Sequence, residues 1–256
     1  MTNLLKRGVG GLLRLTGLQY WPVRVRTGVT AGARWTLYPW SAYWRGTHEP
    51  ALQRALVGLG DIRGWTCWDL GAHFGLYSVG LARRAGPTGE VAAFEPNPAS
   101  FARLERHRRM NGLETLRLFP AAVSDRAGSA DLLTYGDLGS TTTHLAYEDE
   151  TLGAETRPIG VPTVVLDELV DAGKIRPPQF IKVDVEGHAH KALAGAARTL
   201  AAHRPILIVA FHSPAEVAGV QALLTPLGYE SMVIATDSGS ADPVIGHDLL
   251  FTPRPR

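Results

Sequence analysis

The amino-acid sequence predicts an α/β fold with a doubly wound, mostly parallel sheet. From Thr66 onward, short apolar runs alternate with helical patterns, as in sheets with helices on both faces. The stretch TCWDLGAHFG, Thr66 to Gly75, indicates a short buried strand that breaks on an acid and two glycines into a helix. With 256 residues, 45% of them hydrophobic, the chain can bury one large core without disulfides or metals.

Seven strands and four helices follow from these patterns. The strands are expected at Thr66 to Leu70, Glu90 to Phe94, Leu116 to Phe119, Phe180 to Val185, Pro205 to Phe211, Glu230 to Ala235 and Asp248 to Thr252. The helices are expected at Leu76 to Ala85, Ala99 to Asn111, Ala189 to Ala202 and Ala215 to Leu227. Gly112 and Pro214 supply a helix stop and a helix start.

The region between the third and fourth strands departs from this alternation. It is rich in Gly, Thr and Asp, and it predicts a hairpin of Ala130 to Tyr135 with Gly160 to Val165 around the loop GDLGSTTTHLAYEDE. We interpret this insertion, about residues 126–165, as a substrate cap; a tolerated surface loop is the alternative. Residues 1–64 are expected to form an annex of helix and hairpin on a core of residues 65–256.

Composition narrows the classes of partner. The net charge of +2 does not indicate a polyanion binder, and the arginines at 103, 106, 108 and 109 suit a solvated helix face better than a nucleic-acid site. The lone Cys67 rules out an internal disulfide, which fits a cytoplasmic location. The first twenty residues lack a spanning apolar run; a helix packed on its own domain is favoured over a membrane-surface helix.

Several strand ends carry residues suited to a nucleotide-like cofactor. Asp69 ends the first strand, and Gly71 and Gly75 allow close backbone approach. Glu95, 26 positions after Asp69, ends the neighbouring strand, where a carboxylate can accept both hydroxyls of a ribose. After the third strand, Ala121 and Ala122 leave room for a planar base, with Ser124 or Asp125 available to its amino group.

The fourth strand ends in charged residues. Alternation places Lys182, Asp184 and Glu186 on one face, and charges are uncommon in a central strand unless they are paired or used. Asp184 and Glu186 are therefore candidates for the reaction site. An internal Lys182–Asp184 pair that serves the fold alone is the alternative.

The motifs DLGAHFGLYS, AFEPNP, AAVSD, VVLDEL, IKVDVEG and PILIVAFH together resemble the FkbM family of S-adenosylmethionine-dependent methyltransferases, over about residues 47–253. The resemblance implies a class I methyltransferase fold, a seven-stranded sheet whose last strand is antiparallel. It implies cofactor contacts at the positions of Asp69, Gly71, Ala72, Gly75 and Glu95, with Glu49 of the His48-Glu49-Pro50 segment at the methionine end. We also expect the cofactor to be bordered by His73, Asn97, Ala122, Ser124 and Asp184.

The chain departs from the family pattern at three positions. Ala189 and Ala210 stand where the family usually carries acids, and His73 stands where it usually carries asparagine. Histidines surround these places, at positions 188, 190 and 212 and, in the cap, at 144. Each alone is more typical of a structural hydrogen bond, but jointly they make a histidine base a hypothesis. A metal site of histidine and aspartate is an alternative, but the spacing matches no structural zinc pattern, so no metal ligand is assigned.

The leading hypothesis is an O-methyltransferase that passes the methyl group of S-adenosylmethionine to a hydroxyl of a sugar or secondary metabolite. The three spaced glycines of a dinucleotide cradle are missing, and DVEG replaces the motif of nucleobase amino methylation. Asp184 and Glu186 would shape the pocket, His188 or His212 would be the base, and the loop Ser140 to His144 would close over the acceptor. A non-catalytic binding module and an NAD-dependent oxidoreductase are the alternatives. The oligomeric state stays open, with a homodimer as one candidate.

Overall fold

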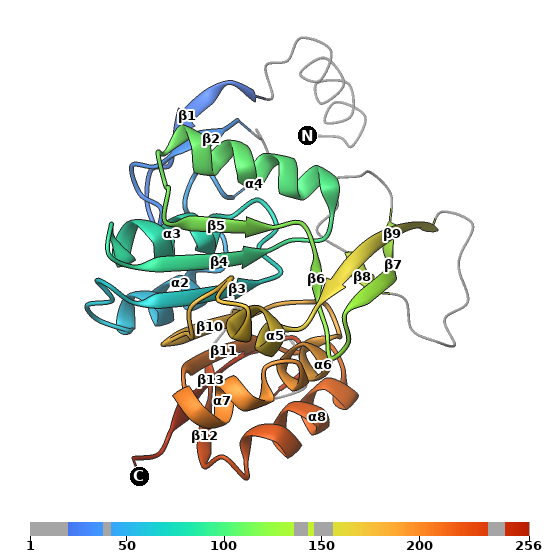
Figure 1. Cartoon of the computed structure of the whole chain (residues 1–256). Helices are drawn as coiled ribbons and strands as arrows, with labels where there is room; N and C mark the ends of the chain where they lie inside the picture. Colours follow the sequence, from blue (N-terminus) through green and yellow to red (C-terminus); the bar gives the residue numbers. More distant parts are fainter. Residues whose placement is uncertain (1–19, 38–41, 136–142, 146–155, 235–243, 256) are drawn as a thin grey trace.

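A seven-stranded sheet forms the centre of the molecule in the computed structural model, which describes residues 20–37, 42–135, 143–145, 156–234 and 244–255 (Figure 1). The strand order is β12-β13-β11-β10-β3-β4-β5. The strands are β3 Thr66–Leu70, β4 Glu90–Phe94, β5 Leu116–Phe119, β10 Phe180–Val183, β11 Ile206–Ala210, β12 Tyr229–Ile234 and β13 Asp248–Pro253. Only β13 runs antiparallel to its neighbours in this sheet, β11 and β12, which confirms the expected fold class.

In chain order the first three strands of this sheet, β3, β4 and β5, have the bounds that the sequence predicts. The fourth is shorter, because β10 ends at Val183, two residues before the expected end. Beyond it, Asp184 donates its backbone N–H to Leu70 O of β3 at 2.9 Å, and Glu186 adopts a left-handed backbone with φ 46°. Asp184 and Glu186 therefore lie on the loop that leaves the sheet, while Lys182 lies within β10.

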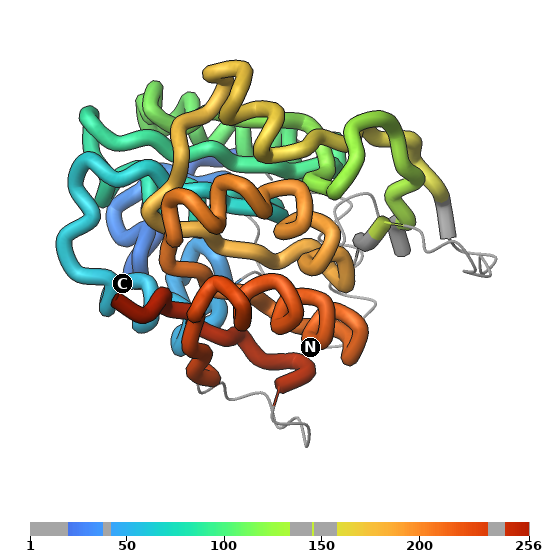
Figure 2. The backbone as a smooth tube through the Cα atoms, turned by 60° about the horizontal axis from the view of Figure 1, so that its bottom comes forward, coloured from blue at the N-terminus to red at the C-terminus, as the bar shows by residue number. Residues whose placement is uncertain are grey.

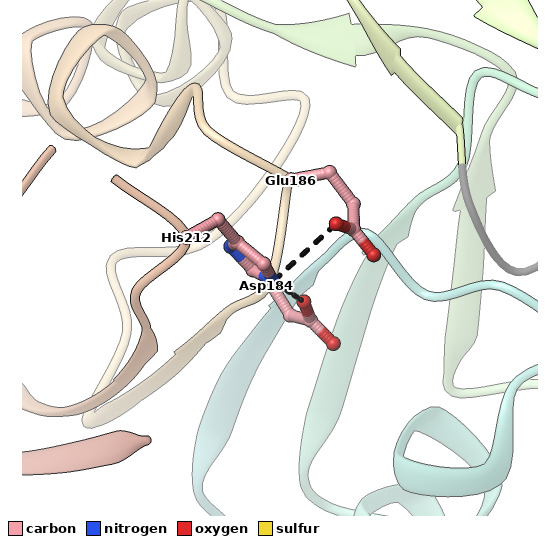
Figure 3. Close-up of side chains that lie close together, drawn as sticks. All are labelled: Asp184, Glu186 and His212. Carbon is pink, nitrogen blue, oxygen red and sulfur yellow. Dashed lines mark ion pairs between the residues drawn. The ribbon is translucent and has the colours of Figure 1, made fainter. Parts of the chain in front are cut away.

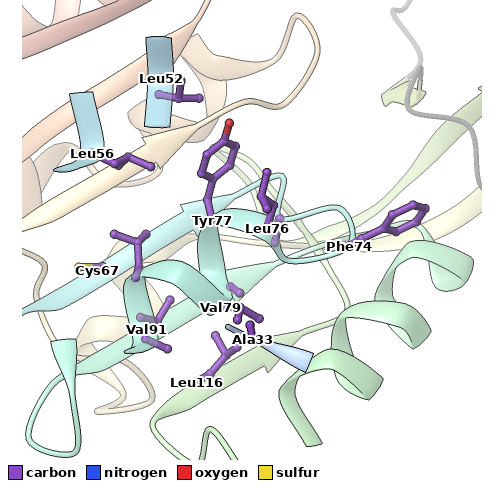
Figure 4. Close-up of a cluster of buried hydrophobic side chains, with 14 of the residues drawn as sticks. Ala33, Leu52, Leu56, Cys67, Phe74, Leu76, Tyr77, Val79, Val91 and Leu116 are labelled. Atoms are coloured by element: carbon purple, nitrogen blue, oxygen red, sulfur yellow. The ribbon is translucent and has the colours of Figure 1, made fainter. Parts of the chain in front are cut away.

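Helices cover both faces of the sheet. On one face lie α2 Pro50–Gly58, α3 Leu76–Ala85 and α4 Pro98–Met110; on the other lie α5 Leu166–Asp171, α6 Ala189–Ala194, α7 Ala197–His203 and α8 Pro214–Leu224. Alternate residues of a strand pack into different layers. Cys67 joins the core under α2 and α3 (Figure 4). Trp68 joins the core on the opposite face of the sheet. Each of these two side chains is fully buried.

The single helix predicted for Ala189 to Ala202 is wrong, because the chain forms α6 and α7 there. A Cβ at Gly195 would lie 2.2 Å from the backbone oxygen of Ser124, so the chain is packed too closely at this point for a regular side-chain-bearing helix. The carboxylate of Asp167 then accepts the backbone N–H groups of Arg198 and Thr199 at 2.9 and 3.0 Å, which caps a new helix start. Neither α5 nor this cap was predicted.

A smaller sheet stands beyond the carboxyl ends of β4 and β5 and projects from the body of the molecule (Figures 1 and 2). Its order is β6-β9-β7-β8. The strands are β6 Ala122–Val123, β7 Gly128–Tyr135, β8 Thr143–Leu145 and β9 Thr156–Val164. The antiparallel pairing of β7 with β9, in which Ala130 faces Val161, confirms the predicted hairpin. Of the loop expected to close over the acceptor, residues 140–142 lie outside the described residues, and of His144 only the backbone is described.

The hairpin of β1 Pro22–Arg24 and β2 Arg34–Thr36 packs against α4. Trp35 is buried and stacks on His107 with 3.6 Å between ring centroids. His107 Nδ1 lies 2.7 Å from Phe74 O, and its Nε2 lies 3.1 Å from the Thr36 backbone nitrogen. A neutral ring with the proton on Nδ1 satisfies both contacts, and burial lowers the pKa of His107 to about 4. The hairpin is thereby joined to the glycine loop.

The segment expected to form an amphipathic helix at the start of the chain, residues 1–19, lies outside the described residues. None of the helices within the described ranges has the length and apolar character that a bilayer crossing requires.

Candidate active site

A cavity of about 320 Å³ opens at the carboxyl ends of β3, β4 and β10. Backbone turns, aromatic rings and charged side chains all contribute to its wall. Of the predicted site residues, it is lined by Glu49, Gly71, Ala72, His73, Glu95, Ala122, Asp184, Glu186 and His188. Ligand sites in open α/β sheets lie at this edge, because the strand ends and helix starts meet there.

The glycine loop is held by backbone bonds to the next strand. Gly71 and Ala72 both donate their N–H groups to Phe94 O, at 3.0 and 2.9 Å. Gly71 has φ 80°, and a Cβ there would lie 1.8 Å from the backbone oxygen of Asp184. Glycine is required at 71 both for this conformation and for the close approach of the β3 and β10 ends. Gly75, with φ 87°, precedes α3 and lies outside the cavity lining.

Glu95 presents a buried carboxylate to the cavity. Its side chain is 5% exposed, and its two oxygens accept the backbone N–H groups of His73 and Asn97 at 2.7 and 2.8 Å. Burial raises the pKa of Glu95 to about 7, although these two hydrogen bonds act in the opposite direction. Further donors, such as the two hydroxyls of a ribose, would favour the ionised form.

Asp69 is placed behind the cavity wall and not in it. It is fully buried, accepts a hydrogen bond from Ser78 Oγ at 2.5 Å, and lies 3.6 Å from Lys182 Nζ. Lys182 also reaches Asp184 at 3.2 Å, so the pair that the sequence suggested is present and is extended by Asp69. Burial opposes the charge of Lys182, but Asp184 and Asp69 outweigh it and raise its pKa. Asp69 therefore positions the strand ends through Lys182.

His73 occupies the left-handed region with φ 49°, where asparagine and histidine are tolerated better than most side chains. Its ring stacks on Phe74 and its Nδ1 lies 3.1 Å from the Tyr43 hydroxyl. Burial lowers the pKa of His73 to about 3, so the ring is neutral. Within the described part of the chain, its buried Nε2 has no hydrogen-bond partner. His73 thus both fastens the loop and borders the cavity.

Glu49 comes to the cavity from the start of α2. It has φ 44°, and its carboxylate accepts the Tyr77 hydroxyl at 2.5 Å and lies 3.3 Å from His48 Nε2. Burial works against ionisation, but the hydrogen bonds and charge of His48, together with the Tyr77 hydroxyl, lower the pKa of Glu49 to about 2. An ionised carboxylate suits the ammonium group of an amino-acid ligand.

The far wall of the cavity is formed by small residues after β5. Ala121 and Ala122 are each 5% exposed and line the cavity together with Phe94. Ser124 lies outside the lining; its hydroxyl is 3.0 Å from His188 Nε2 and donates to Asp125 at 3.1 Å. Asn97 is also outside it, because its side chain caps α4 by accepting from Ala99 and Ser100.

A second cavity, of about 370 Å³, shares Glu49, Asp184 and Glu186 with the first. His212, at the end of β11, faces it, and its Nε2 lies 3.7 Å from Asp184 and 3.4 Å from Glu186 (Figure 3). The other ring nitrogen lies 3.6 Å from Glu216, which is fully buried on α8. Burial disfavours the charged ring, but Glu216, Glu186 and Asp184 raise the pKa of His212 to about 9.

Asp184, Glu186 and His212 form the one group of potential metal ligands found among the described residues. One ligand atom from each lies within 4.8 Å of the others. In the structure these three side chains form an ion-paired cluster in which His212 carries a proton.

Sequence reasoning missed several cavity residues. Tyr43, Tyr77, Leu132 and Leu145 line the first cavity. Tyr77 follows the glycine loop by two positions, so its place in the first turn of α3 was a usable signal. Tyr43, Leu132 and Leu145 come from the annex and the small sheet, and only the folded chain brings them to the strand ends.

A family model described as the Methyltransferase FkbM domain matches residues 69–231. The chain belongs to the FkbM methyltransferase family. The match covers the glycine loop, Glu95 and the β10 and β11 ends that surround the two cavities. The family supports S-adenosylmethionine as the cofactor, as the sequence resemblance implied.

Comparison with a curated relative gives 31% identity over 166 residues to the hexuronic acid methyltransferase AglP of Haloferax volcanii. The match spans 62% of this chain and 60% of the relative. Among solved structures, a methyltransferase FkbM from Methylobacillus flagellatus has 19% identity and a TM-score of 0.53, over 76% of this chain and 45% of its own. A putative rRNA methylase from Clostridium thermocellum has 10% identity and a TM-score of 0.50, over 80% and 94%. These two structures share the fold.

The cavity of this FkbM chain fits S-adenosylmethionine in three respects. Glu95 offers a buried carboxylate whose pKa burial raises to about 7, so hydroxyl donors of a ligand would favour its ionised form. The ionised Glu49 also lines the cavity, and so does His73, whose buried Nε2 has no hydrogen-bond partner in the described ranges. The small side chains of Ala121 and Ala122 leave space for a flat ring.

Proposed function

We propose that this chain is an S-adenosylmethionine-dependent O-methyltransferase that acts on a hydroxyl of a sugar or secondary metabolite. One observation carries the proposal: a cofactor-sized cavity and a second cavity meet at Asp184 and Glu186. Two ligands held in them would face each other across these carboxylates. Bringing two reactants together in this way accounts for much of the rate that an enzyme of this kind supplies.

Different residues of the first cavity would bind different parts of the cofactor. Glu95 would accept hydrogen bonds from the ribose hydroxyls, and Ala121 and Ala122 would flank the base. Glu49 would form an ion pair with the amino group. When bound, S-adenosylmethionine supplies a methyl group on a positively charged sulfur, which needs no activation by the protein.

The chain's own task is to orient the acceptor hydroxyl and take its proton. His188 borders the first cavity, and burial together with the nearby charge of Lys191 lowers its pKa to about 4, so the ring is neutral near pH 7 and keeps a lone pair that can receive the hydroxyl proton during methyl transfer. Of the two predicted base candidates, His212 is instead held in its protonated form. We therefore assign the base role to His188 and the orientation of the hydroxyl to Asp184 and Glu186.

The alanines at 189 and 210 do not by themselves favour a non-catalytic binding module. Ala189 is fully buried at the start of α6 and donates its N–H to Glu216 Oε1 at 2.8 Å. Glu216 also accepts a hydrogen bond from the backbone N–H of His212 at 2.7 Å. The carboxylate of Glu216 on α8 thus lies beside Ala189 and His212. The absence of acids at positions 189 and 210 is therefore weak support for a non-catalytic module.

Isothermal titration with S-adenosylmethionine and S-adenosylhomocysteine tests the cofactor, and absence of heat with both would remove the proposal. A mass-spectrometric screen of hydroxylated acceptors for the gain of one methylene unit tests the reaction. For the base, His188→Gln should lower kcat about a hundredfold. His203→Gln, on the exposed end of α7, is the matched control and should retain full turnover.

A further inference from the structure

The second cavity offers carboxylates to an acceptor and few cations to balance them. Glu49, Asp184, Glu186 and Asp248 all line it. Burial, and after it the charges of Glu49 and Asp184, raise the pKa of Asp248 to about 6. No lysine or arginine of the described ranges lines this cavity; besides His247, its only basic side chain is His212.

The cations beside the second cavity are already engaged. His212 lies within 4 Å of three carboxylates, those of Asp184, Glu186 and Glu216. Lys182, which borders the first cavity, is 3% exposed and lies between Asp69 and Asp184. A negatively charged acceptor would therefore meet carboxylates without a free cationic partner among the described side chains.

Resting on the proposed function, we propose that the acceptor is an uncharged, hydroxyl-rich molecule of the neutral-sugar class, and that the second cavity discriminates against acid sugars. Carboxylates accept hydrogen bonds from neighbouring hydroxyls, so the cavity is well furnished to bind a polyol. An acceptor carboxylate would be repelled by the same groups, since like charges brought together at an interface disfavour binding. The chain would then differ in acceptor from its relative AglP, whose name specifies a hexuronic acid.

Matched acceptor pairs test the proposal on the full chain. Methyl glycosides of the gluco, galacto and manno series are supplied with either a hydroxymethyl group or a carboxylate at C6, and methyl transfer is followed by mass spectrometry. We expect transfer to at least one neutral member, more than about tenfold faster than to its acid partner. Equal or faster transfer to an acid member, or no transfer to any member by protein that binds S-adenosylhomocysteine, would overturn the proposal. Failure to bind S-adenosylhomocysteine would instead remove the proposed function.

Each pair is run with EDTA and with Mg²⁺, because a cation at Asp184, Glu186 and His212 would change the sign of the cavity. Transfer to acid members that appears only with Mg²⁺ would contradict the proposal; the same neutral preference under both conditions would support it. The variant Asp248→Asn should reduce the preference for the neutral member by about tenfold. Glu230→Gln, on the exposed face of β12, is the matched control and should leave the preference unchanged. An unaltered preference in Asp248→Asn would refute the role of the cavity charge.

Discussion

The two cavities share three side chains but are built in different ways. Part of the first wall is fixed by backbone hydrogen bonds: the glycine loop is bonded to Phe94 O, and backbone N–H groups hold Glu95. The wall of the second depends on side-chain charges at the ends of β10, β11 and β13 and on Glu49 of the annex. Backbone conformation restricts the residue type at each position, whereas a charged wall can be assembled from many sequences. The residues of the cofactor cavity are therefore easier to predict from the sequence than those of the acceptor cavity.

The sharpest test of a backbone-built wall is Gly71→Ala. The new Cβ would lie 1.8 Å from the Asp184 backbone oxygen, in a residue with φ 80°. Backbone cannot move aside as a flexible side chain can, so we expect a loss of about 4 kcal/mol in the free energy of unfolding, and loss of cofactor binding. Urea denaturation and calorimetric titration measure the two effects.

Gly112→Ala is the matched control for Gly71. Gly112 also has a left-handed backbone, with φ 61°, but a Cβ there meets no atom within 4 Å. Gly112→Ala should therefore lower the free energy of unfolding by only about 1 kcal/mol, the strain of a left-handed backbone, and should leave cofactor binding intact. Equal losses in the two variants would show that the close approach of β3 and β10 does not matter.

The next largest effect should come from Glu95. Because burial raises the pKa of Glu95 to about 7, and donors from a ligand favour the ionised form, affinity for S-adenosylhomocysteine should rise with pH. The increase should approach tenfold per pH unit below the pKa of the free protein and level off above it. Glu95→Gln should bind more weakly and lose this pH dependence. Affinity that is flat between about pH 6 and pH 8 in the unaltered protein would contradict the assignment.

Glu186→Gln separates the two cavities kinetically. The change removes a charge at their border and keeps the shape of the side chain. We expect kcat to fall about tenfold or more, while the Kd for S-adenosylhomocysteine changes less than threefold. Parallel losses in both quantities would mean that Glu186 belongs to the cofactor wall.

The smallest expected effect is the pH dependence of stability that His212 provides. Its pKa in the folded chain is about 9, above the usual value of 6.5, so the ring binds its proton more tightly when folded. This contribution is complete below about pH 6.5 and is lost as the pH rises through about 9. The fall in Tm across that window should be smaller in His212→Gln than in the unaltered protein. An identical fall in both would exclude this ion-pair cluster as its source.

The predicted strands β3, β4 and β5 match the structure residue for residue, because apolar runs flanked by glycine, acid or proline leave few alternatives. The left-handed backbone of Gly71 and the carboxylate of Glu95 were equally visible, since both follow from residue type at a strand end. The position of Asp69 was not: it ends the strand as expected, but Lys182 and Ser78 draw it behind the wall.

Other errors share a tertiary cause. The break between α6 and α7 depends on Ser124 and Asp167, which are distant from Gly195 in sequence. Tyr43 and Leu145 reach the first cavity from separate additions to the central sheet. The protonation of His212 arises from carboxylates on α8 and on the loop between β10 and α6. No local pattern encodes these contacts.

The rate at which a thiol reagent modifies Cys67 can report how often the central sheet opens. Cys67 is the sole cysteine, lies fully buried in the middle of the sheet, and burial raises the pKa of its thiol to about 12. A thiol reagent should therefore modify the native chain only at the rate at which β3 becomes accessible. Cofactor or acceptor that tightens the sheet should slow this modification, so labelling rates can rank ligands before any product is known. A second cysteine introduced on the small sheet could then carry a dye while Cys67 stays silent.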